Sequence, residues 1–223
     1  PYSAPIIFVN DIKRTDEQKG VFGEVNFALS DTSELTVGAR WYDIAVDLEG
    51  SANGAYGNKG ATSDSGGGGA NLSVQYGPNN TNGYPDKAET DGVIGKITYS
   101  WNPNEDLMYY VTWSEGFRPG LLNRPAGTSN AAGTYTIPAV TDTDEVTNYE
   151  FGWKATLMDG SMRFNGSVFM SDITGLQSTI FDAAIVNLFF SDNAADAEIL
   201  GVEGDFVYLT DNDWMLSGAF SFL

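Results

Sequence analysis

The sequence of 223 residues contains no cysteine and no histidine. The lack of cysteine excludes disulfide bonds and thiolate metal sites within this chain. The lack of histidine removes the most common general base in catalysis and the most common ligand of transition metals. We expect no catalytic residue, no metal site and no cofactor.

Basic residues are also few, with 11 Lys and Arg against 30 Asp and Glu, and the formal net charge is −19. Such a surface repels the phosphate backbone, so nucleic acid is not expected as a partner. No segment approaches the run of about 20 apolar residues that a membrane helix needs. This excludes a helical membrane span, but it leaves open a transmembrane β-barrel, whose signal is weaker in each segment.

Glycine and aromatic residues, in contrast, are abundant: the chain has 26 Gly, 13 Phe, 11 Tyr and 5 Trp. This composition favours strands and turns over helices. When the sequence is read with a period of two, it predicts eight strands. They span residues 19–30, 34–48, 92–102, 107–117, 145–157, 161–173, 198–209 and 214–223.

Each predicted strand has one apolar face. In the strand 145–157, Phe151 and Trp153 lie on one face and Glu150 and Lys154 lie on the other. No position on the apolar faces is charged, whereas the opposite faces carry Glu24, Arg40, Lys96, Glu150, Lys154, Arg163, Glu203 and Asp205. In the strand 34–48 the apolar parity changes after Asp43, which predicts a β-bulge there.

Alternation is typical both of a soluble β-sandwich and of a membrane barrel, and two further features favour the barrel. Aromatic residues that suit a membrane interface gather near strand ends on the apolar face: Trp41, Trp101, Trp113, Tyr208 and Trp214. Short turns at 31–33, 103–106, 158–160 and 210–213 alternate with long polar connections at 49–91, 118–144 and 174–197. Outer-membrane barrels have short periplasmic turns and long outer loops. The predicted fold is therefore all-β, an antiparallel transmembrane β-barrel, with a soluble β-sandwich binding module as the alternative.

Four segments in order resemble the barrel of TonB-dependent outer-membrane receptors. Residues 20–41 look like a family hairpin that ends in G-x-R-[WY], and 110–120 are similar to Y-S-x-G-F-R-P. Residues 148–154 are similar to N-Y-E-x-G-x-K, and 193–203 to N-A-x-x-A-x-x-x-G-x-E. The resemblance covers about residues 19–215 and implies a 22-stranded barrel in the bacterial outer membrane, plugged by an N-terminal domain. Because no plug or TonB-contacting box is found here, we expect 1–223 to be one partial barrel domain that does not transport alone.

The resemblance also implies a function, which is uptake of a scarce nutrient with energy from the TonB–ExbB–ExbD system. The first cargo expected is a ferric siderophore, with cobalamin, haem and an oligosaccharide left open. A passive, porin-like barrel in outer-membrane lipid is the alternative. An upstream plug-like segment of about a hundred residues or more, near ordinary domain size, would favour the receptor.

Two groups of residues are candidates for the site. Arg118, Asn123 and Arg124 begin a long connection, where positive charge could meet an anionic chelate. Pairing of these arginines with neighbouring carboxylates is the favoured alternative. On the charged face, we expect a second group to face the barrel lumen and to pack against the plug rather than to act in catalysis: Glu150, Lys154, Arg163, Glu203 and Asp205.

Three polar segments suggest other sites, and each has a simpler interpretation. The run Gly66–Gly69 lacks the Lys-Ser/Thr and the helix of a phosphate loop, so we predict a flexible tip of a long loop. The acidic clusters 142–145 and 211–213 offer oxygens for Ca²⁺, but neither fits an EF-hand loop. We therefore predict solvated turn carboxylates at both clusters.

Overall fold

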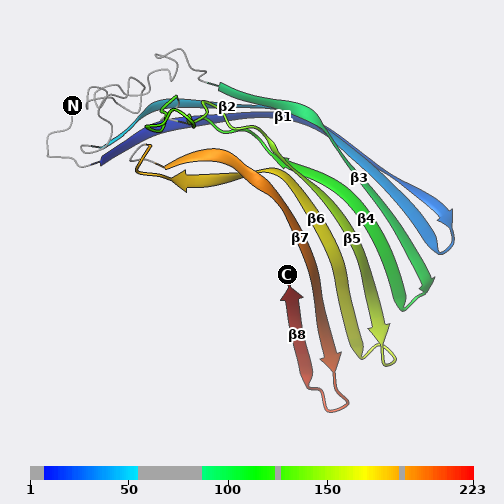
Figure 1. Ribbon diagram of the computed structural model, residues 1–223. Helices are drawn as coiled ribbons and strands as arrows, with labels where there is room; N and C mark the ends of the chain where they lie inside the picture. Colours follow the sequence, from blue (N-terminus) through cyan, green and yellow to red (C-terminus); the bar gives the residue numbers. More distant parts are fainter. Residues whose placement is uncertain (1–7, 55–86, 124–126, 186–188) are drawn as a thin grey trace.

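The computed structural model describes residues 8–54, 87–123, 127–185 and 189–223. Within these ranges eight strands pair in chain order in one antiparallel sheet (Figure 1). They are β1 (Phe8–Ser30), β2 (Ser33–Gly54), β3 (Lys87–Asn104), β4 (Leu107–Arg118), β5 (Asp144–Leu157), β6 (Met162–Phe181), β7 (Phe189–Leu209) and β8 (Met215–Phe222). No helix in the described part of the chain is long and apolar enough to cross a membrane. The predicted all-β class is confirmed.

The sheet is a curved wall with two different ends. The short turns between β1 and β2, β3 and β4, β5 and β6, and β7 and β8 all lie at the lower end in Figure 1, and we call this the turn end. We call the opposite end, where β4 ends and β5 begins, the distal end. In the turn after β5, Met158, Asp159 and Gly160 have φ of 54°, 52° and 91°. Three successive left-handed residues reverse the chain within a few residues, which explains how the strands stay adjacent.

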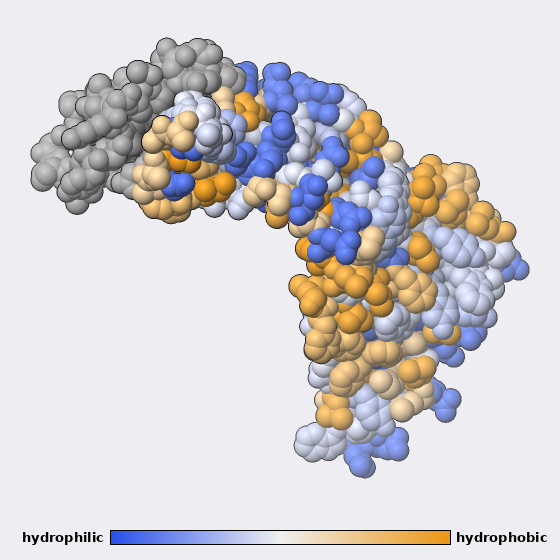
Figure 2. Space-filling view, in the orientation of Figure 1, coloured by the Kyte–Doolittle hydropathy of each residue, from blue (hydrophilic) through white to orange (hydrophobic). Residues whose placement is uncertain are grey.

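The register places the predicted apolar faces of the eight strands on one side of the sheet, except for the part of β2 beyond Asp43. One row of paired residues crosses every strand: Phe27, Leu35, Tyr99, Val111, Phe151, Val168, Val202 and Phe222. Val111 is 53% exposed and Phe222 is 68% exposed. Figure 2 shows hydrophobic residues gathered over the lower part of β7 and β8. Soluble proteins rarely expose apolar patches of this extent, so this apolar face requires a non-aqueous surrounding.

The apolar face has a limited height. On β5 it runs from Leu157 to Tyr149, and on β7 from Tyr208 to Leu200. This matches the ~9–11 residues of a transmembrane strand. On five strands the next position on the same face, toward the distal end, is acidic: Asp43, Asp91, Glu115, Asp172 and Glu198. On β1 it is Lys19, and on β5 it is Thr147. We call the apolar belt below these residues the membrane band.

Several strands continue far beyond the membrane band. The predicted strands end too early, and 174–197 is predicted as a loop, whereas β6 extends to Phe181 and β7 begins at Phe189. The prediction is wrong here because strand residues above the band no longer face lipid, so they need not alternate. The backbone ladder continues without that pattern, to the pair Phe181 and Phe189.

The predicted bulge at Asp43 is also wrong. The pairing of β2 with β1 and with β3 runs through Asp43 without a shift. Instead Tyr42, Ile44 and Val46 point to the opposite, polar face and are only 6%, 4% and 2% exposed. They form a small core whose other members are Ala88, Ile94, Phe117, Leu122 and Val140. The apolar parity changes because the buried side changes: lipid contacts one face below Asp43, and a folded connection covers the other face above it.

Candidate functional site

The charged residues predicted for the lumen share one face of the sheet. The register pairs Lys154 with Asn165 and Asn165 with Asp205, on the face opposite the apolar row. Glu150, Arg163 and Glu203 have the same parity on their strands and therefore lie on this polar face. That this face lines a lumen stays a prediction at this point.

Hydrogen bonds fix parts of the polar face. The hydroxyl of Tyr110 on β4 donates to Glu150 Oε1 on β5 over 2.5 Å. The amide of Asn165 on β6 donates to Asp205 Oδ2 on β7 over 3.1 Å. These contacts orient the carboxylates across neighbouring strands and leave them on an open surface.

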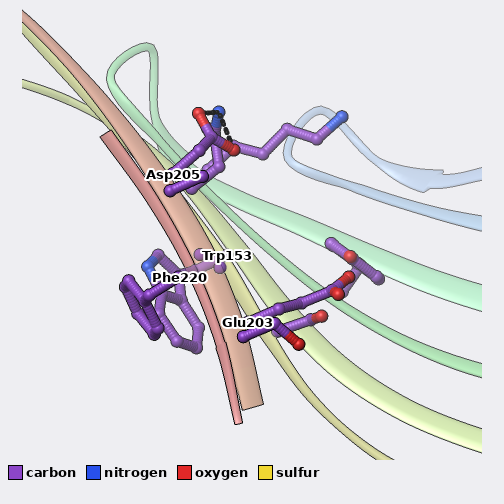
Figure 3. Close-up of a pocket in the computed structure, with 12 residues that line it drawn as sticks. Trp153, Glu203, Asp205 and Phe220 are labelled. Atoms are coloured by element: carbon purple, nitrogen blue, oxygen red, sulfur yellow. Dashed lines mark hydrogen bonds between the residues drawn. The ribbon is translucent and has the colours of Figure 1, made fainter. Parts of the chain in front are cut away.

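Figure 3 shows that the sheet has carboxylate side chains on one side and aromatic rings on the other. Glu203 and Asp205 project to one side of β7, while Trp153 and Phe220 lie on the other side. An open hollow there is lined by residues of both sides, and those of the polar side include Lys154, Asn165 and Ser167. No enclosed pocket surrounds the two carboxylates, and in the described residues no group of three or more Asp or Glu is placed to hold a metal ion.

A second group of polar residues lies at the distal end, around Arg118. Arg118 closes β4 and forms an ion pair with Asp144, the first residue of β5. Its Nε donates to Asp144 Oδ2 over 2.8 Å, and its Nη2 donates to the Gln177 carbonyl over 3.2 Å. The Arg118 side chain is 57% exposed, whereas that of Asp144 is 6% exposed. The arginine charge is thus matched by a carboxylate of its own protein.

Asp144 is a buried carboxylate and not the solvated turn residue that we predicted. Burial raises its pKa, but the hydrogen bonds from Arg118 and from the Gln177 backbone N–H outweigh burial, and the pKa lies below the usual 3.8. The same hydrogen bond to Asp144 raises the pKa of Arg118. The other acidic cluster, 211–213, is exposed as predicted.

Asn123 is buried at 4% exposure in the connection between β4 and β5, residues 119–143. Its Nδ2 donates to the carbonyls of Pro138 (3.0 Å) and Ser191 (2.7 Å), and its Oδ1 accepts from the Ser191 N–H (2.8 Å). The carboxamide is thus occupied by backbone partners. A role of Asn123 or Arg118 in ligand contact stays a prediction, and Arg124 and the run Gly66–Gly69 lie outside the described residues.

The sequence did not point to several residues that hold the distal end together. Gln177 on β6 donates from Nε2 to the carbonyls of Pro119 and Asp142, over 3.0 Å each. The Tyr135 hydroxyl donates to Asp192 over 2.6 Å. Burial and this hydrogen bond raise the pKa of Tyr135 to about 12. These residues lie in segments predicted as polar loops, so only the folded contacts reveal their role.

A curved antiparallel wall with an exposed apolar belt, a charged opposite face and short turns at one end defines a transmembrane β-barrel. The family comparison agrees with that class: residues 1–223 match the family described as "TonB dependent receptor-like, beta-barrel". The chain therefore belongs to the TonB-dependent receptor barrels. These are β-barrels of the bacterial outer membrane, and the family consists of transport receptors and not enzymes.

Three solved structures have a similar fold. The siderophore receptor PiuA from Acinetobacter baumannii has a TM-score of 0.63 at 16% identity, over 95% of this chain and 26% of that one. The ferric yersiniabactin uptake receptor FyuA from Yersinia pestis has a TM-score of 0.59 at 15% identity, over 94% and 27%. The copper transporter OprC has a TM-score of 0.62 at 14% identity, over 93% and 29%. A comparison with curated proteins gives no match. The chain thus spans only 26% to 29% of the length of these three receptors.

Proposed function

We propose that this chain is part of the barrel wall of a receptor that imports a scarce nutrient with energy from the TonB–ExbB–ExbD system. The observation that supports this most is the apolar row from Phe27 to Phe222 across eight strands in a chain of this family. In a barrel wall the backbone hydrogen bonds are satisfied between strands, so the apolar face can contact lipid. The complete receptor would also contain a plug domain and further strands, with 1–223 as one partial barrel domain.

The polar face would then line the lumen and contact the plug. Glu150, Lys154, Arg163, Glu203 and Asp205 lie on this face. Charged side chains on an open wall can pair with opposite charges on a domain that fills the barrel. Such contacts can break when TonB pulls on the plug, because exposed ion pairs are worth only ~0–1 kcal/mol each.

The proposed cargo is a chelated metal, with a ferric siderophore as the first candidate. The structural neighbours include a ferric yersiniabactin receptor, a siderophore receptor and a copper transporter, which supports this class. Cobalamin, haem and an oligosaccharide are the other outcomes of the test. Arg118 and Arg124 are the candidate cations for an anionic chelate at the mouth.

The test uses the complete gene in its own bacterium under iron restriction. Deletion of the receptor should abolish growth on one ferric siderophore and leave growth on ferrous iron unchanged. Deletion of tonB should give the same loss. Uptake that survives the tonB deletion would support a passive barrel, and growth that depends on cobalamin, haem or a sugar would change the cargo.

A further inference from the structure

Two asparagines join the β4–β5 connection to β7 in a reciprocal way. Asn123 of the connection pairs with both the N–H and the carbonyl of Ser191 on β7. Asn193 of β7 accepts from the Asp142 N–H (2.8 Å) and donates to the Asp142 carbonyl (3.0 Å). Each carboxamide thus replaces a peptide group and pairs with one backbone residue of the other segment. We call Asn123, Ser191, Asn193 and Asp142 the distal joint.

The two halves of the distal joint are close to each other on both segments. On β7 only Asp192 separates Ser191 from Asn193, and Asp192 itself accepts from Tyr135 of the connection. Within the connection, the backbone segments that carry Asn123 and Asp142 are hydrogen-bonded to each other. The bonds run from Asn123 N to Ala139 O and from Thr141 N to Leu121 O, each 2.9 Å. Separation of Asn123 from Ser191 should therefore also move the backbone that holds Asn193 to Asp142.

An apolar contact fills the space beside the distal joint. Ile137 of the connection is 1% exposed, and Phe190 of β7 is 3% exposed. The two residues pack together with Tyr135, Ile180 and Ile185 around them. Separation of the segments would expose this cluster and leave backbone groups without partners, and a buried polar group left unpaired costs more than an ordinary hydrogen bond gains.

We propose that the described residues of the connection 119–143 and those of the distal β6–β7 hairpin, 176–185 and 189–195, move as one body, held by the distal joint. Figure 1 shows the connection beside the distal ends of β6 and β7. A ligand that contacts and displaces either segment should then displace the other segment as well. The distal joint acts within the wall itself, whatever the cargo and whether or not TonB is involved.

Hydrogen exchange of the intact receptor in lipid nanodiscs tests the proposal. In the variant Asn123→Ala, the Ser191 N–H loses its acceptor. If the segments form one body, exchange should rise about tenfold, which corresponds to ~1.4 kcal/mol, both in 189–193 and in 139–143. Asn193→Ala should give the same paired response. A rise confined to the segment that lost its partner would overturn the proposal.

The matched control is Asn130→Ala. Asn130 accepts from the N–H groups of Thr134 and Tyr135 within the connection, so its loss removes no hydrogen bond between the two segments. Exchange should rise in 130–135 and much less in 189–193 than it does in Asn123→Ala. Protection of β5 residues 149–157 reports whether the barrel remains folded. If Asn123→Ala lowers the protection of β5, the variant Tyr135→Phe is used in its place. This variant deletes only the hydrogen bond from the Tyr135 hydroxyl to Asp192. A paired response then supports the proposal, and an unpaired one contradicts it.

Discussion

The indole of Trp153 on β5 lies directly over Gly166, its cross-strand partner on β6. A Cβ at Gly166 would overlap the indole ring. The same arrangement recurs on the apolar face, where Phe220 lies over Gly204 and Phe206 over Gly218. The glycines at these three positions thus provide room for large aromatic rings.

We expect Gly166→Ala to destabilise the receptor by ~1–3 kcal/mol, because the added methyl group forces the indole of Trp153 off its position. The measurement is urea-induced unfolding in lipid vesicles, followed by tryptophan fluorescence. Gly23→Ala is the matched control, since Gly23 also lies on the apolar face but a Cβ there has no atom within 4 Å. Equal midpoints for the two variants would show that the space above Gly166 is not needed.

Val111 and Thr112 are neighbours on β4 that face opposite sides of the sheet. Val111 belongs to the apolar row, and Thr112 contacts the Thr98 hydroxyl over 2.9 Å on the polar face. In the intact receptor we expect Val111→Arg to cost ~2–4 kcal/mol, because the charge enters hydrocarbon. Thr112→Arg should cost much less in the same unfolding assay. A larger cost at Thr112 would mean that the faces are assigned the wrong way round.

The sequence predicted the architecture because lipid imposes a pattern on every strand that contacts it. The row through Val111, Phe151 and Val168 could be foreseen from a period of two alone. The positions of the short turns followed from their Asp, Asn and Gly residues. Each of these signals is local, so a single chain sufficed to recognise eight strands and their two faces.

The distal end could not be predicted in the same way, because its contacts join residues far apart in the sequence. Two strands, β5 and β6, separate Asn123 from its partner Ser191 in the sequence. A buried asparagine and a ligand-binding asparagine have the same sequence signature. The burial of Ile44 on the polar face likewise depends on Leu122 and Val140, which belong to a connection without regular periodicity.

Asp172 on β6 and Glu198 on β7 face each other directly, just above the membrane band. Like charges in opposite positions of an antiparallel pair are destabilising. Asp172→Lys should therefore stabilise the receptor by ~0.2–1 kcal/mol at low ionic strength. The gain should shrink in ~1 M salt, where the Debye length falls to about 3 Å. Asp172→Asn separates removal of repulsion from new attraction and should give a smaller gain. A loss of stability with lysine would contradict the expected repulsion between the two carboxylates.

The ion pair of Asp144 and Arg118 makes the distal end sensitive to acid. Because the pKa of Asp144 in the folded protein lies below its ordinary value of 3.8, the ionised carboxylate favours folding. This contribution is fully present above the ordinary value and is lost as the pH falls through the lower, folded pKa.

Thermal unfolding in detergent, followed by circular dichroism, measures this effect when wild type and Asp144→Asn are compared. At neutral pH the variant should be less stable by ~1–3 kcal/mol, because hydrogen bonds to a charged acceptor are lost. The difference in Tm should shrink below pH 3.8 as the wild-type carboxylate takes up its proton. Asp211→Asn, in an exposed turn, is the control and should leave Tm unchanged at neutral pH. The difference in Tm between wild type and Asp144→Asn could instead stay the same below pH 3.8. The negative charge of Asp144 would then not be what stabilises the folded protein.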